Sequence, residues 1–198
     1  IFQSICLQEN ILTKDEKNYL IKYIDSVPYN ADEIDHDLLN ELNSEFNVEI
    51  YHGLPINSGI IGVVFSGIIR NEKVVVKILK KNIKSKLIDV FEEIELITKL
   101  LQWIPYINQL NLNKLFLDNK QSLLNQTDFL KEADNIEIFK SKNHNMEQYK
   151  IPKVYKEITE KFNEVIVMEN IKGITIHDLV NYNKDICDEF GKLLIKFG

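Results

Sequence analysis

Hydrophobic positions along this chain change their spacing several times, and each change predicts a different kind of element. Between Thr13 and Pro28 the apolar residues recur at helical spacing, with Thr13 as N-cap and Glu16 completing a capping box. A second helix is predicted over residues 34–45, and its buried face is formed by Leu38, Leu39 and Leu42. These two segments predict a helical N-terminal extension over residues 1–47.

The spacing then becomes that of short β-strands. Strands rich in β-branched residues are predicted at 48–51, 62–69 and 73–79, with a turn at Arg70-Asn71-Glu72. Two more are predicted later in the chain, at 150–157 and 164–169, joined by a turn at 160–163. The pattern indicates an antiparallel meander.

Helical spacing returns between these two groups of strands. A long amphipathic helix is predicted from Lys84 to Trp103, with its apolar stripe at Leu87, Phe91, Ile94, Ile97, Leu101 and Ile104. Residues 107–126 form a polar, asparagine-rich stretch, and a helix over 127–142 carries Phe129, Ala133, Ile136 and Phe139. A last helix is predicted at 176–197. Strands and helices together predict an α+β fold.

Composition narrows the classes of partner. Lysine and arginine number 24 against 30 aspartate and glutamate residues, a formal charge of -6, and no basic tract is present, so nucleic acid is not expected to bind. Cys6 and Cys187 lack metal-ligand spacing, which argues against a zinc site or a disulfide framework. The longest apolar run, 60–69, is about half the length that spans a bilayer. We expect an intracellular protein, soluble or peripheral to a membrane.

The residues with the clearest chemistry are small residues between two strands and a lysine on the next strand. In Pro55–Phe65 the chain reads PINSGIIGVVF, and Lys77 ends the run VVVK. A loop of small residues lets backbone N–H groups approach a polyphosphate, and the lysine can reach the same phosphates. A lysine flanked by valines needs a carboxylate partner, which Glu132 on a separate helix could provide. The strand ending at Met168-Glu169 reads as a hinge whose backbone would bind adenine.

Alternative readings remain open for several of these residues. Lys77 could be an exposed lysine on an edge strand, and its carboxylate partner could instead come from the long helix, at Glu92, Glu93 or Glu95. Asp128 could be a helix N-terminal carboxylate or could lie near a metal.

The order of these motifs is similar to that of the ABC1 family, also called the UbiB or AarF-domain kinases. Lys77 matches the V-A-V-K lysine, and Glu132, Ala133 and Asn135 match F-x-x-E-A-x-N. Residues near the hinge match P-x-V-Y and V-L-V-M-E-x-x-x-G, namely Pro152, Val154, Tyr155, Met168, Glu169 and Gly173. Gln3 matches the glutamine of K-x-G-Q, whose lysine would lie just upstream of Ile1. Departures also occur: Phe2 replaces the glycine of that motif, Asn57, Ser58 and Gly59 replace three alanines, and Gln126 replaces the first carboxylate of E-x-D.

The resemblance implies a protein-kinase-like N-lobe that binds ATP or ADP with Mg²⁺, in a family associated with lipid metabolism and coenzyme Q. Lys77 and Glu132 would be the catalytic pair. Nucleotide contacts would come from Asn57, Ser58, Gly59, Gly62, Lys77, Met168, Glu169 and Ile171, and further motif positions are Gln3, Gln126 and Asp128.

The resemblance also divides the chain into an extension at 1–47, an N-lobe with helical insert and hinge at 48–170, and the start of a C-lobe at 171–198. No H-x-D-x-x-x-x-N or D-F-G motif occurs, so metal ligands and the catalytic loop are expected beyond Gly198. Two functions follow: part of an atypical kinase or ATPase, or an inactive docking module that binds a lipid or a protein.

Overall fold

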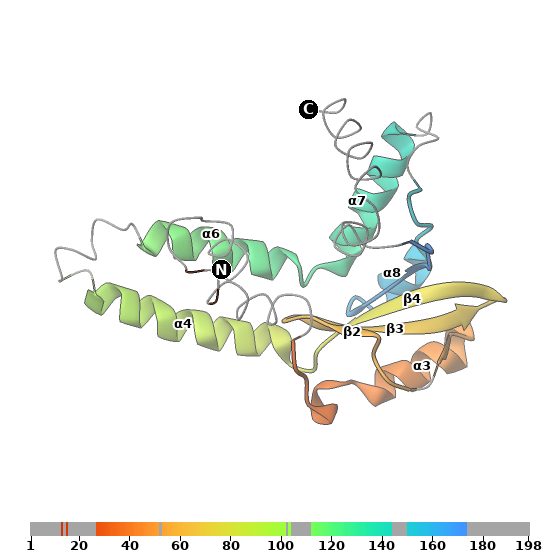
Figure 1. Ribbon diagram of the computed structural model, residues 1–198, viewed down its shortest axis with the longest axis horizontal. Coiled ribbons are helices and arrows are strands. Elements are labelled where there is room, and N and C mark those ends of the chain that lie inside the picture. The colour runs from red at the N-terminus through yellow and green to blue at the C-terminus, as the bar shows by residue number, and fades with distance from the viewer. Residues whose placement is uncertain are drawn as a thin grey trace.

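The computed structural model describes residues 13, 15, 27–51, 53–101, 103, 112–143 and 150–173. The helices predicted at 13–28 and 176–197 fall largely or wholly outside these residues, as do Gln3 and both cysteines. Two layers of helices pack on the two faces of one antiparallel sheet, with α3 and α7 on opposite sides of it (Figure 1). This arrangement confirms the predicted α+β fold with a kinase-like N-lobe.

The sheet contains five strands in the order β1-β3-β4-β5, with β2 also paired to β3. Their bounds are β1 Glu49–Ile50, β2 Asn57–Ser58, β3 Gly62–Ile69, β4 Glu72–Leu79 and β5 Val165–Glu169. The hairpin between β3 and β4 has a two-residue loop, because Ile69 pairs with Glu72 and both Arg70 and Asn71 have positive φ. The predicted strands at 62–69 and 164–169 match closely, and β2 was not predicted.

Helices occupy the remaining described segments. They are the 3₁₀ helix η1 Ala31–Glu33 and the α-helices α3 His36–Phe46, α4 Ile83–Leu101, α6 Leu112–Asn125, α7 Phe129–Lys142 and α8 Lys156–Lys161. Helix α3 begins with Asp35 as N-cap, whose side chain accepts from Leu38 N–H, and it buries Leu42 as predicted. No helix among the described residues is both long and apolar enough to cross a bilayer.

Alternation along β4 separates two hydrophobic cores. Val74, Val76 and Ile78 face one core, which also contains Leu42 of α3 and Ile158 of α8. Leu79 faces the other core together with residues of α4, α7 and β5, including Leu87, Phe91, Phe129, Ala133 and Ile166. Because successive strand side chains point to opposite faces, Lys77 lies on the second face.

The structure differs from the sequence predictions at three places, of which the first is a wrongly predicted strand, the second a helix that was not predicted and the third one position of the α4 stripe. The strand predicted at 150–157 is reduced to a single bridge between Val154 and Met168, because the Lys- and Glu-rich run from Lys156 onward forms helix α8 with Ile158 buried. The asparagine-rich stretch contains helix α6, whose Leu123 and Leu124 pack on the second core. On α4, Ile97 is 53% exposed and Thr98 takes the buried position expected of the stripe.

Candidate functional site

Four residues form a row across the sheet on the face that contains Lys77. Asn57 pairs with Val64, Val64 pairs with Lys77, and Lys77 pairs with Ile166. Residues directly opposite each other in antiparallel strands project to the same face, so β2 places Asn57 near Lys77 although the two are on separate strands. The predicted loop and the predicted lysine therefore belong to one surface.

Glu132 is the carboxylate partner of Lys77. The Lys77 Nζ lies 3.0 Å from Oε1 and 2.8 Å from Oε2 of Glu132, and the side chains are 29% and 34% exposed. Beneath them, the Nζ stands 4.6 Å from the ring centroid of Phe129, which is fully buried. The lysine is thus held by two groups from α7 yet stays within reach of solvent.

The start of helix α7 places the Phe129 ring and the Glu132 carboxylate beside Lys77. Asp128 is its N-cap, with the carboxylate accepting a hydrogen bond from Lys131 N–H at 3.0 Å, and Glu132 lies in the first turn. Phe129 and Glu132 are three residues apart and share one side of the helix. The N-cap reading of Asp128 is therefore seen directly, and its role near a metal stays a prediction.

The rival carboxylates on α4 do not contact Lys77. Glu95 pairs with Lys99 on its own helix at 2.9 Å, and Glu92 and Glu93 are exposed. The reading of Lys77 as an exposed surface lysine is also wrong, because β4 lies between β3 and β5 and the side chain is paired.

Two N–H groups of the loop are used within the loop itself. The N–H of Ser58 donates to Asn57 Oδ1 at 2.7 Å, and the N–H of Gly59 donates to the Gly62 carbonyl at 2.9 Å. The Ser58 side chain is buried. Within the described part of the chain, the N–H groups of Ile60 and Ile61 meet no backbone acceptor. These two groups are the loop's available donors for an anion.

Gly62 is required by packing between strands. A Cβ at this position would lie 2.5 Å from the Ile78 carbonyl oxygen, whereas at Gly59 the nearest atom would be 3.8 Å away. Gly62 therefore allows β3 to approach β4 closely, and Gly59 has space around it.

The predicted hinge is fixed to both neighbouring segments. Glu169 N–H donates to the Lys153 carbonyl and Asn170 N–H donates to the Lys73 carbonyl. The Glu169 carboxylate lies 2.7 Å from Lys150 Nζ, and this hydrogen bond lowers the pKa of Glu169. Among the described residues no backbone acceptor meets the Ile171 N–H, which leaves it as a donor at the end of the strand.

A cleft of about 910 Å³ opens beside the Lys77–Glu132 pair. Its walls come from the end of α6, from α7 and from residues 150–152, and they include Gln126 and Asn135. The volume lies within the range of small-molecule sites. None of the described lining residues belongs to 57–62 or to 168–171, so the cleft adjoins the lysine from the α7 side.

The described residues fit the phosphates of a nucleotide better than they fit its metal. Lys77 and the N–H groups of Ile60 and Ile61 are donors suited to anionic oxygen. In the described part of the chain, no three His, Cys, Asp or Glu side chains lie together so that they could hold a metal ion. We therefore assign no described residue to Mg²⁺.

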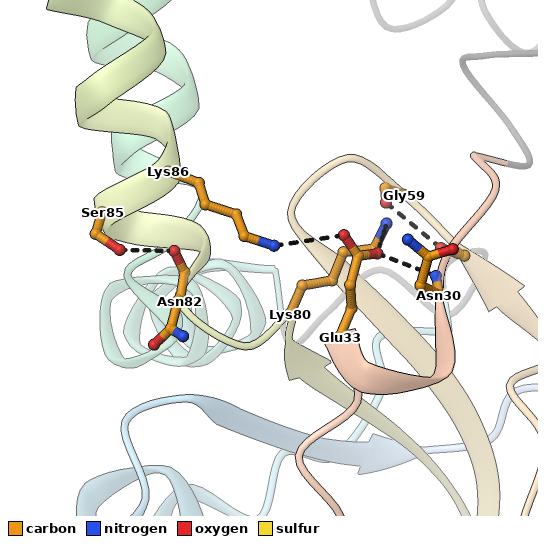
Figure 2. Close-up of polar contacts among 8 residues, drawn as sticks. Asn30, Glu33, Gly59, Lys80, Asn82, Ser85 and Lys86 are labelled. Atoms are coloured by element: carbon orange, nitrogen blue, oxygen red, sulfur yellow. Dashed lines mark hydrogen bonds and ion pairs between the residues drawn. The ribbon is translucent and has the colours of Figure 1, made fainter.

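Sequence reasoning missed two charged clusters that fix the surroundings of the site. In one, the carboxylate of Glu33 meets Lys80 and Lys86 (Figure 2). In the other, the hydroxyl of Tyr155 and the Nζ of Lys153 both bond to Glu72. Each cluster joins residues that are far apart in the sequence, so no spacing pattern indicates it. The one sequence signal is the position of Lys80 directly after an apolar strand, where a buried lysine would need a charged partner.

Two comparisons with known proteins point to the same family. A family model described as the ABC1 atypical kinase-like domain matches residues 25–195. Over 131 residues the chain is 32% identical to an uncharacterised, chloroplastic aarF domain-containing protein kinase of Arabidopsis thaliana. That alignment covers 63% of this chain and 24% of the relative, so the chain spans about a quarter of that protein's length.

Proposed function

Because the chain belongs to the ABC1 atypical kinase-like family, we propose that it forms the ATP- or ADP-binding part of an atypical kinase or ATPase. The observation that carries the proposal is the two-oxygen contact between Lys77 of the central strand β4 and Glu132 of α7. A lysine on a central strand paired with a glutamate on a helix is the arrangement that protein kinases use to hold the phosphates of ATP.

Each described residue then has a role that follows from its chemistry. The Nζ of Lys77 binds phosphate oxygens, and Glu132 holds the ammonium in place. The N–H groups of Ile60 and Ile61 approach the same phosphates from the loop, beside Asn57. The apolar face near Val64, whose side chain is half-buried, receives the base, and the Ile171 N–H is the hinge donor that bonds its edge.

Phosphoryl transfer by the complete protein is part of the same proposal. Mg²⁺ bound with the nucleotide would neutralise phosphate charge, and kinases hold it through aspartate and asparagine side chains of later motifs. The residues described here bind and orient the nucleotide. They leave the activation of the acceptor to other parts of the protein.

Binding of Mg-ATP and Mg-ADP by the complete protein tests the proposal, measured by calorimetry and by thermal stabilisation. A ligand at one hundred times its Kd stabilises a native protein by about 2.7 kcal/mol. Lys77→Ala should abolish this stabilisation. The matched control is Lys73→Ala, which removes an exposed lysine from the same strand. Equal stabilisation of wild type and Lys77→Ala would disprove the assigned role.

A second candidate function, docking of a lipid or a protein, is favoured by the outer face of α4. There Leu96 and Leu100 are 63% and 66% exposed, and Trp103, just after the end of the helix, is 88% exposed. A complete protein that binds neither Mg-ATP nor Mg-ADP, yet loses a partner when Trp103 is changed to serine, would support docking. The family's association with lipid metabolism makes lipid vesicles the first partner to test.

A further inference from the structure

The carboxylate of Glu33 joins two regions that are far apart in the sequence, residues 30–33 and residues 80–86. Its Oε2 lies 3.2 Å from Lys80 Nζ, and its Oε1 lies 3.6 Å from Lys86 Nζ of α4. The Asn30 N–H also donates to Oε2, at 3.4 Å. Figure 2 shows Lys80 and Lys86 reaching Glu33 from different elements. We name these four residues the Glu33 clasp.

Lys80 makes the clasp strong. Its side chain is only 5% exposed, and Glu33 is 21% exposed. An ammonium removed from water needs a charged partner, and a buried pair that loses one member leaves the other uncompensated. Burial acts to raise the pKa of Glu33, but the hydrogen bond and charge of Lys80, with Asn30 and Lys86, outweigh it, so the pKa is lowered.

Backbone hydrogen bonds connect the clasp to the loop of the candidate site. Lys80 N–H donates to the Ile61 carbonyl at 2.9 Å, and Lys81 N–H donates to the Glu33 carbonyl at 2.8 Å. At the other end of the loop, Val27 N–H donates to the Ser58 carbonyl at 2.9 Å. Residues 27–34 therefore hold the Ser58 end of the loop directly and are tied through Glu33 to Lys80 and Lys81, and Lys80 holds the Ile61 end.

We propose that Glu33 is a positioning residue for nucleotide binding, acting through Lys80 to hold the N–H groups of Ile60 and Ile61 toward the phosphates. The loop re-enters the sheet at Gly62, which pairs with Leu79, two residues from Lys77. A shift of the end of β4 against residues 27–34 therefore moves the loop's donors relative to the lysine. The inference rests on the proposed function and adds the residue that fixes its loop.

Glu33→Gln tests the inference in the complete protein, because it keeps the shape of the side chain and removes its charge. Hydrogen exchange without nucleotide should become faster at the N–H groups of Gly59 and Lys80. The Kd for Mg-ATP should rise about tenfold, a typical size for coupling between sites. The control is Ile158→Val, which weakens the opposite core and should leave the Kd unchanged.

The outcomes separate the two proposals. Wild type that fails to bind Mg-ATP overturns the proposed function and this inference with it. Wild type that binds, with an equal Kd for Glu33→Gln, overturns the inference alone. If Glu33→Gln does not fold, Glu33→Asp keeps the charge but shortens the reach to Lys80, and its Kd should rise about threefold. An unchanged Kd in Glu33→Asp also overturns the inference.

Discussion

At the scale of single residues, the Lys77–Glu132 pair should matter much for nucleotide binding and little for the stability of the fold. Both side chains are about one-third exposed, so the pair is expected to contribute less than about 1 kcal/mol to the free energy of unfolding. Glu132→Gln should leave the melting temperature almost unchanged and should strongly reduce stabilisation by Mg-ATP. Glu95→Gln, which breaks the exposed pair with Lys99, is the control and should change neither.

Two glycines of the loop should respond differently to the same substitution. Gly62→Ala places a methyl group 2.5 Å from a carbonyl oxygen and should destabilise the fold by about 1–3 kcal/mol. Gly59→Ala has space, and its backbone does not have positive φ, so it should be neutral or stabilise by up to about 1 kcal/mol. Urea denaturation of both variants checks this; equal destabilisation would contradict it.

Sequence reasoning succeeded where a local physical requirement acts. A lysine within an apolar strand needs a charged partner, which predicted a helix carboxylate for Lys77. Only the structure could distinguish Glu132 from the rival carboxylates on α4. The use of the Ser58 and Gly59 N–H groups could not be predicted, because it depends on the Asn57 side chain and on how tightly the loop closes. The Glu33–Lys80 contact joins residues with no pattern in common.

At the scale of elements, Tyr155 attaches the segment before β5 to the hairpin of β3 and β4. Tyr155 is 2% exposed, and its hydroxyl donates to Glu72, which also bonds Lys153. Tyr155→Phe removes this hydrogen bond and should destabilise the fold by about 1–2 kcal/mol in urea denaturation. Lys153→Met, which removes the exposed partner, should have a smaller effect. A larger effect for Lys153→Met would show that the tyrosine is not the anchor.

The elements that were missed share a cause. Helices α6 and α8 are rich in polar residues, and each packs through only a few apolar side chains, such as Leu123 and Ile158. A segment with so few apolar positions has a weak helical signal, and its conformation is decided by the core that it covers. The long strands and α4 were predictable because their patterns continue for several turns or alternations.

At the scale of the whole molecule, opposite charges in contact define a pH range of greatest stability. The pKa values of Glu33, Glu72, Glu95 and Glu169 are lowered, mainly by hydrogen bonds from lysine or, for Glu72, from Tyr155; at Glu33 these bonds outweigh burial, which alone would raise the pKa. These carboxylates contribute their full stabilisation above pH 4.5, the ordinary pKa of glutamate, and the contribution is lost as the pH falls through their lowered pKa values in the folded protein.

At alkaline pH the stability changes in the opposite direction and falls as the pH rises. Hydrogen bonds that Lys153 and Lys156 donate to Glu72 and Asp134 raise the pKa values of the two lysines, and burial raises the pKa of Tyr155. Their contribution is complete below about pH 10 and is lost as the pH rises through the raised values. Stability should therefore be greatest between these limits, and both flanks can be followed by urea denaturation as a function of pH.

The acid flank is the loss of stability below pH 4.5. Added salt should distinguish the contribution of buried ion pairs to this loss from that of exposed pairs. Ionic strength screens exposed pairs such as Glu95–Lys99, but it screens the pair of Glu33 with buried Lys80 much less. At high salt, the remaining loss of stability below pH 4.5 should come mainly from Glu33, whose charged neighbours are Lys80 and Lys86. Glu33→Gln should then flatten the acid flank at high salt, whereas Glu95→Gln should not. If both variants keep the wild-type flank, the clasp does not control acid stability.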